Sequence, residues 1–349
     1  MDEERDLELI SIPFAVGVAI GVHIPDCAGT PLLCLCAFAI LLFAAMGGKT
    51  PLLPTLFLLT GSFCGVTGSS PSLPTDWAAM HSAARLRALI DSIPFAYENS
   101  AALVKALLTG DRSGLESGVV SAFRQSGASH ILALSGLHLG LIHLIVRRIM
   151  SVLGNSPVAG ICRAILTTVA ATYYTLMTGA SPSTVRALLF IAISEWSGVS
   201  PGRRGSLKRS LLLALTLQLA IRPDNISSIS FQMSYLAMCG IVFLLPGLHG
   251  WFPGDGRAFN PMKRIWDAAA LSISCQIFTA PLAWIRFHTF PKYFLLTNII
   301  SLPLTSAAMV ISAAVIALAA AGIHPLWLIA IDDRMLQALV SVLETISVM

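Results

Sequence analysis

Residues 290–322 read FPKYFLLTNIISLPLTSAAMVISAAVIALAAAG, and Lys292 is the charged residue among them. About 20 apolar residues in a row are enough to cross the hydrocarbon core of a bilayer as a helix. This run is longer than that and contains Pro303, so a bent helix or two half-helices is expected. A stretch of this kind predicts a helical membrane protein.

The composition of the whole chain agrees with that prediction. Of 349 residues, 55% are hydrophobic and 11% are charged, whereas an ordinary soluble domain has about 25% charged residues. The mean hydropathy is +0.78. This excludes a soluble enzyme, a disordered tail and a secreted disulfide scaffold, because the polar residues needed to cover a water-exposed surface are missing.

The expected fold is all-α and polytopic, with about 10 to 11 transmembrane segments, some of them short or broken. The candidate spans are 9–24, 31–46, 51–68, 130–153, 158–178, 183–199, 207–221, 226–247, 265–285, 290–322 and 325–348. The last span carries Asp332, Asp333 and Arg334 in its middle, so a position along the membrane surface is an alternative for it.

Three regions follow along the chain: an N-terminal membrane segment of about three spans (1–68), an external linker with amphipathic helices (69–129), and a helix bundle (130–349). The external region predicts helices from Trp77 to Ile93, Asn99 to Leu108 and Leu115 to Gln125. Gly110 is expected to end the second helix, and Asp111 to begin a turn.

The basic residues indicate the topology. With the N-terminus in the cytoplasm, the cluster at 203–209 and most other Lys and Arg residues lie on the cytoplasmic side, whereas the short outer loops hold Arg222, Arg286 and Lys292. This bias follows the positive-inside rule. The sequence carries neither the phosphate-binding G-x-x-x-x-G-K-[ST] motif nor the H-E-x-x-H zinc motif. We therefore expect no ATPase, no catalytic residue, no metal and no cofactor in this chain.

Histidines are concentrated in the run SHILALSGLHLGLIH at 129–143. On a continuous helix, His130, Ser135 and His138 would share one face, and Gly136 and Gly140 would lie opposite, where two glycines four residues apart permit close helix packing. The polar side chains either bond neighbouring helices or line a polar path, since lipid would penalise them.

A second polar segment, TGASPSTVR at 178–186, combines a helix start with an arginine. Ser181 is a good N-cap and Pro182 a good first helical residue, followed by Ser183. Arg186 lies one turn inside the apolar run, so it reaches outward, pairs with an acid or meets an anion. A helix N-terminus with an arginine suits phosphate.

Two further polar sets occur at membrane depth. One is Phe231, Gln232 and Ser234 within 227–235; the other is Gln276 with Asn298. Each set alone is typical of helix–helix hydrogen bonding, whereas together they indicate a polar path through the bundle.

These motifs resemble the ComEC family, the DNA channels of bacterial transformation. The matching segments are 106–115, 129–138, 179–187 and 229–234, and the resemblance covers about 97–348. It implies an inner-membrane channel for single-stranded DNA in a bacterium. In that channel His130, Ser135 and His138 line the mouth, and Ser181, Ser183 and Arg186 meet phosphates. Phe231, Gln232 and Ser234, with Gln276 and Asn298, line the remaining path.

The resemblance also implies partners: an external DNA receptor, a cytoplasmic helicase or ATPase motor, and a separate nuclease. Family members often carry an OB-fold domain and a metallo-β-lactamase-like domain, which this sequence does not include. The alternatives are a transporter or channel for a small anionic solute, and a structural membrane protein in which the motifs only pack helices. The sequence leaves the oligomeric state open.

Overall fold

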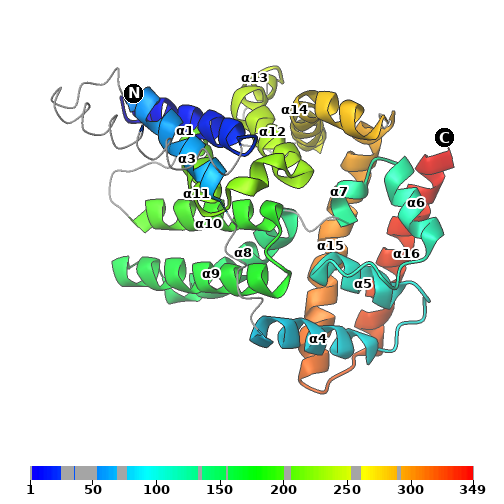
Figure 1. Ribbon diagram of the computed structural model, residues 1–349. Helices are drawn as coiled ribbons and strands as arrows, with labels where there is room; N and C mark the ends of the chain where they lie inside the picture. Colours follow the sequence, from blue (N-terminus) through cyan, green and yellow to red (C-terminus); the bar gives the residue numbers. More distant parts are fainter. Residues whose placement is uncertain are drawn as a thin grey trace. The chain divides into compact units, whose positions relative to one another are not determined.

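The structure is a computed structural model, and it describes residues 2–24, 35, 53–68, 77–132, 136–154, 156–199, 206–252, 261–288 and 292–348. Helices and the loops between them make up these residues, with no strand in any of the described ranges (Figure 1). The all-α prediction is confirmed.

The helices follow the predicted spans closely. In chain order they are α1 (Asp2–Gly21), α3 (Leu53–Thr67), α4 (Trp77–Asp91), α5 (Ser100–Thr109), α6 (Ser117–Gln125), α7 (Ser129–Leu132), α8 (Gly136–Met150), η3 (Ser151–Leu153), α9 (Pro157–Met177), α10 (Pro182–Val199), α11 (Leu207–Ile221), η4 (Pro223–Ser227), α12 (Ile229–Phe243), α13 (Leu245–Gly250), α14 (Pro261–Phe287), α15 (Phe294–Ala320) and α16 (Leu326–Val348). The predicted span 31–46, apart from Leu35, and the linker at 69–76 lie outside the described residues.

Three stretches are long and apolar enough to cross a membrane, judged by length and composition within the described ranges: Ile229–Gly250, Pro261–Phe287 and Phe294–Ala320. The chain is therefore an all-α membrane protein. The total of 10 to 11 spans, the cytoplasmic N-terminus and the division at 68 and 129 stay predictions.

Two compact units make up the chain, and each is built from separated stretches of sequence. The first comprises Met1–Pro74, Met150–Thr168 and Val185–Tyr235. The second comprises Thr75–Ile149, Val169–Thr184 and Leu236–Met349.

In the first unit, α1 packs against α3 and α11. Glycines make the α1–α3 contact close: a Cβ atom placed on Gly17 would lie 2.1 Å from the Leu58 carbonyl oxygen, and one on Gly61 would lie 2.1 Å from the Phe14 carbonyl oxygen. Gly21 and Gly65 continue the pattern one turn on. These are two small-x-x-x-small stripes facing each other, the arrangement that lets membrane helices approach at backbone distance.

Polar contacts join α1 to α11 in the same unit. The Lys208 ammonium pairs with the Glu8 carboxylate, and the Thr216 hydroxyl donates to Oγ of Ser11 at 2.9 Å. Because Ser11 is buried, its hydroxyl needs such a partner to avoid an unpaired polar group in the interior.

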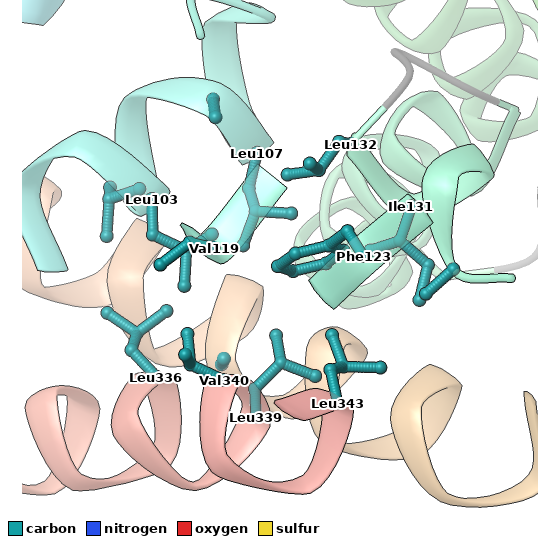
Figure 2. Packing of buried hydrophobic residues seen from close by; sticks show 14 of the residues in the cluster. Leu103, Leu107, Val119, Phe123, Ile131, Leu132, Leu336, Leu339, Val340 and Leu343 are labelled. Carbon is teal, nitrogen blue, oxygen red and sulfur yellow. The ribbon is translucent and has the colours of Figure 1, made fainter. Parts of the chain in front are cut away.

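The second unit is organised around a hairpin of α15 and α16, which packs with α5 and α6. Figure 2 shows the core between them, where Leu103, Leu107 and Phe123 lie above Leu336 and Leu343 of α16. The buried residues of α16 recur every three or four positions, as expected for the inner stripe of an amphipathic helix.

The structure bears on the two alternatives left open for the last segments. The run 290–322 contains one helix, α15, with Pro303 inside it, and not two half-helices. In α16, Asp332 and Asp333 are buried and hydrogen-bonded, whereas Arg334 is exposed. Internal hydrogen bonds thus account for the acidic pair, and the position of α16 relative to the membrane stays a prediction.

Candidate functional site

His130 belongs to the single turn α7 (Ser129–Leu132), and His138 to α8, which begins at Gly136. Residues 133–135 lie outside the described residues, so the face that His130, Ser135 and His138 are expected to share stays a prediction. His138 is fully buried, whereas His130 is exposed and places Nδ1 3.2 Å from the Gly127 carbonyl oxygen. Ser135 lies outside the described residues.

The predicted packing role of Gly140 is not seen. A Cβ atom placed on Gly140 meets nothing within 4 Å. The close glycine contacts occur instead between α1 and α3, and at Gly240, where a Cβ would lie 2.1 Å from the Ser274 carbonyl oxygen of α14. A small-x-x-x-small pattern permits close packing but does not require it.

Arg112 links two of the polar motifs in the second unit. Its Nε donates to the Leu132 carbonyl oxygen at 3.1 Å, at the end of α7. Leu108, in the same motif as Arg112, accepts a 2.7 Å hydrogen bond at its carbonyl oxygen from the Tyr174 hydroxyl of α9. The segment 106–115 is thus tied to the start of the histidine run and to α9.

The turn after α5 has the predicted form. Gly110 adopts a left-handed conformation with φ of 75° and ends the helix, as a residue without a side chain does readily. Asp111 then accepts hydrogen bonds from the Ser113 N–H at 3.1 Å and the Ser113 hydroxyl at 2.7 Å. Arg87 of α4 forms a 2.8 Å ion pair with the same carboxylate. These contacts fix the loop that presents Arg112.

A tight reversal precedes α10. Gly179 has φ of 84° and Ala180 has φ of 48°, and the Ala180 N–H donates to the Thr175 carbonyl oxygen at 2.8 Å. Ser181 is the N-cap as predicted: its Oγ accepts from the Thr184 N–H at 3.3 Å, and Pro182 is the first helical residue. Ser183 follows in the first turn.

Arg186 belongs to a polar cluster in the first unit. It lies within electrostatic reach of the Tyr235 hydroxyl, which donates to Oε1 of Gln218 at 2.9 Å. Gln218 and Tyr235 are both buried. The ring of Phe231 is also buried, with its centroid 4.5 Å from that of Tyr235. Phe231 therefore packs against the cluster, and its predicted place along a DNA path stays a prediction.

The other residues predicted to line the path do not form one cluster within either unit. Gln232 donates from Nε2 to the Ile226 carbonyl oxygen at 2.7 Å, and Ser234 is half-buried on the same helix. Gln276 on α14 and Asn298 on α15 are half-buried on two helices that pack together in the second unit. The first unit thus holds Arg186 and the 231–234 set, and the second holds His130, His138, Gln276 and Asn298.

Several residues with structural consequences were not predicted. Asp333 accepts hydrogen bonds from the N–H groups of Ala96 and Tyr97 and from the Ser100 hydroxyl, and Asp332 accepts from Ser312. The presence of two acids in an apolar helix was the available signal. The indication in the sequence was weaker for Tyr235 and Gln218, because a single tyrosine or glutamine in a membrane helix usually does no more than hydrogen-bond a neighbouring helix.

Comparison with protein families gives a match to the Competence protein family over residues 107–349. No solved structure matches. The match includes Arg112, the histidine run, the α9–α10 reversal and the Arg186–Tyr235 cluster.

Among individual proteins, the chain is 26% identical over 207 residues to "ComE operon protein 3" of Bacillus subtilis, covering 59% of this chain and 24% of that protein. It is 25% identical over 209 residues to "Competence protein ComA" of Neisseria gonorrhoeae, covering 58% of this chain and 28% of that protein. A third relative, "Uncharacterized protein YcaI" of Escherichia coli, is 23% identical over 218 residues, 59% of this chain and 27% of that protein.

The chain spans about a quarter of the length of these curated relatives. The family match nevertheless covers well over half of the chain and confirms the resemblance seen in the motifs. The chain therefore belongs to the Competence protein family.

Proposed function

We propose that this chain forms the membrane part of a channel that carries single-stranded DNA into the cytoplasm during natural transformation. The observation that carries the proposal is Arg186, which lies five residues, about 1.4 turns, after the Ser181 cap of α10 and within electrostatic reach of Tyr235 in the buried Tyr235–Gln218 pair. An arginine near a helix N-terminus suits phosphate, the group that every nucleotide of a strand presents. Family membership supports the same proposal.

The surroundings of Arg186 suit transient contact with a strand. A channel must let its cargo leave, so scattered cations serve better than a continuous basic groove. The chain has a formal net charge of only +4. A phosphate passing Arg186 would meet one cation near a neutral hydrogen-bonded pair, Tyr235 and Gln218.

The test is a transformation assay in the bacterium that carries this protein. Arg186→Ala is expected to lower DNA uptake at least about tenfold, since one lost charge-assisted hydrogen bond of about 1.5–3 kcal/mol corresponds to that range. Arg148→Ala, which removes an exposed arginine near the end of α8, is the matched control and should leave uptake unchanged. Unchanged uptake in Arg186→Ala, with normal membrane insertion, would remove this arginine from the path.

A channel for a small anionic solute is the second candidate, because it would use the same arginine and helix start. Purified protein in vesicles separates the two. DNA transport is expected to depend on strand length and to leave inorganic phosphate flux at background. Phosphate flux that depends on Arg186, without DNA uptake, would favour the solute channel.

The proposal has consequences for location and partners. We place the protein in the bacterial inner membrane with a cytoplasmic N-terminus, on the basis of its basic-residue distribution. An external DNA receptor, a cytoplasmic helicase or ATPase motor and a separate nuclease would supply binding, energy and strand degradation. In this proposal the chain itself acts as a channel and not as an enzyme.

A further inference from the structure

The segment between Ile93 and Ser126 follows α15 over most of its length. At one end, the Ser126 carbonyl oxygen accepts a 2.8 Å hydrogen bond from Thr297, in the first turn of α15. At the other end, Ile93 packs in one cluster with Ala319, in the last turn. Thr297 and Ala319 are separated by 22 residues, or about 33 Å at 1.5 Å per residue.

Two carboxylates of α16 hold the segment 93–126 and α15 together between these two end contacts. Asp333 of α16 accepts hydrogen bonds from the Tyr97 N–H at 2.9 Å and from the Ser100 hydroxyl. Its neighbour Asp332 accepts from the Ser312 hydroxyl of α15 at 2.9 Å. The first turn of α5 is therefore held at the level of Ser312, about 22 Å along α15 from Thr297.

The two faces of α15 differ in a way that identifies the lipid side. Its hydroxyl side chains at Thr297, Ser301, Thr305 and Ser312 are all buried. Exposed positions on the helix are apolar, such as Leu296 and Val310. A helix of 27 residues with this pattern presents its apolar side to lipid and its polar side to protein.

Between Arg334 and Thr345 the exposed face of α16 has the opposite character. Arg334, Gln337, Ser341, Glu344 and Thr345 are exposed together with Ala338, and their spacing places them along one stripe of the helix. The exposed residues near the two ends of α16, such as Trp327 and Val348, are apolar. Leu336, Leu339 and Leu343 lie on the buried side. A charged side chain at membrane depth requires a partner or water. The stripe is therefore unsuited to contact with lipid tails.

The same requirement applies to α6, which lies against α16. Glu116, Ser117 and Gln125 are exposed, whereas Val119 and Phe123 point into the shared core (Figure 2). Thus both elements that pack together alongside the membrane-crossing α15 carry polar exposed surfaces.

We infer that residues 93–126 and α16 form one water-lined wall at membrane depth, with α15 between that wall and the lipid. This differs from the external position predicted for residues 69–129. The depth of about 33 Å between the two end contacts matches a hydrocarbon core of about 30 Å, so a segment tied to both ends of α15 lies across the membrane with it.

The composition of the α16 stripe indicates what occupies the space beside it. Between Arg334 and Thr345 it holds one cation, one anion, amide and hydroxyl groups and Ala338, and it has no net charge. Such a surface suits water and a polar chain in transit and provides no tight anion site. That the transiting chain is single-stranded DNA rests on the proposed function, whereas the water-lined wall does not.

Single cysteines introduced into a variant lacking the seven native cysteines test the wall. Gln337→Cys and Ser341→Cys report on the α16 stripe, and Ser117→Cys reports on α6. Val310→Cys and Ala314→Cys, at exposed positions of α15, are the matched lipid-facing controls. The probe is a charged, membrane-impermeant maleimide applied to intact cells and to inverted vesicles, with labelling after denaturation as the reference for total protein.

The three wall positions are expected to label at least about tenfold faster than the two α15 positions, because maleimide reacts with the thiolate, which forms in water and not in lipid. Equal rates at the two groups, or wall positions that react only after denaturation, would overturn the inference. The latter result would mean that protein covers the stripe. This measurement does not involve DNA uptake, so its failure is distinct from failure of the Arg186 uptake test.

Discussion

Tyr235 donates a 2.9 Å hydrogen bond from its hydroxyl to Oε1 of Gln218, joining α12 to α11 at a position where both side chains are buried. Arg186 lies within electrostatic reach of this hydroxyl. The pair therefore joins two helices of the first unit, and Arg186 of α10 lies near it.

Tyr235→Phe is expected to lower the free energy of unfolding in detergent by about 1 kcal/mol, the usual net value of one neutral hydrogen bond. In the transformation assay it should lower uptake less than Arg186→Ala, because the cation remains while a neighbouring hydrogen bond is lost. Tyr173→Phe is the matched control, since Tyr173 is exposed on α9. Equal stability of the two variants would show that the hydroxyl contributes nothing.

The neighbouring carboxylates of α16 are expected to respond in opposite ways to the same substitution. Asp333→Asn should lower stability by about 1–3 kcal/mol, because an amide cannot accept all the hydrogen bonds that Ala96, Tyr97 and Ser100 donate. Asp332→Asn should be neutral or stabilising. Within the described residues Asp332 takes its hydrogen bonds from Ser312 alone, and a buried charge with so little compensation is costly.

Thermal unfolding of the two variants in the same detergent measures this difference. Each variant is the control for the other, since the two positions are adjacent and the substitution is the same. A larger loss in Asp332→Asn than in Asp333→Asn would contradict the assignment of Asp333 as the residue that holds the start of α5.

Arg112→Ala is expected to destabilise the second unit by about 1–2 kcal/mol, because it removes the charge-assisted bond to the Leu132 carbonyl oxygen. The loss should appear as faster proteolysis near α7. Arg124→Ala, an exposed arginine on α6, is the control. Arg112→Lys should restore little, because an ammonium on a flexible stem lacks the fixed geometry of the guanidinium.

Most of the fold could be predicted because its main signal is local. Apolar runs between Pro, Gly and charged residues give the helix boundaries, and α11 was predicted to the residue at 207–221. Ser181 and Gly110 were also recognised correctly, because a helix cap depends on a few neighbouring residues. Local signals of this kind need no knowledge of tertiary packing.

The contacts that the sequence could not reveal are tertiary. The Leu132 carbonyl oxygen bonds to Arg112 from another segment, and the spacing within 129–143 contains no sign of that contact. Likewise, the sequence shows two acids at 332 and 333 within an apolar helix but not their partners, which lie on α15 and at residues 96–100.

Glycines spaced four residues apart do not reveal from the sequence which helices pack closely. The stripes Gly17–Gly21 and Gly61–Gly65 form the close α1–α3 contact, whereas Gly140 has the same sequence pattern and touches nothing within 4 Å. Gly61→Ala is therefore expected to push the helices apart and to cost about 1–3 kcal/mol, the usual range for overpacking. Gly140→Ala should be neutral or stabilising by up to about 1 kcal/mol, because alanine favours a helix over glycine by that amount. Thermal unfolding in detergent measures both variants, and a destabilised Gly140→Ala would show that this glycine packs closely after all.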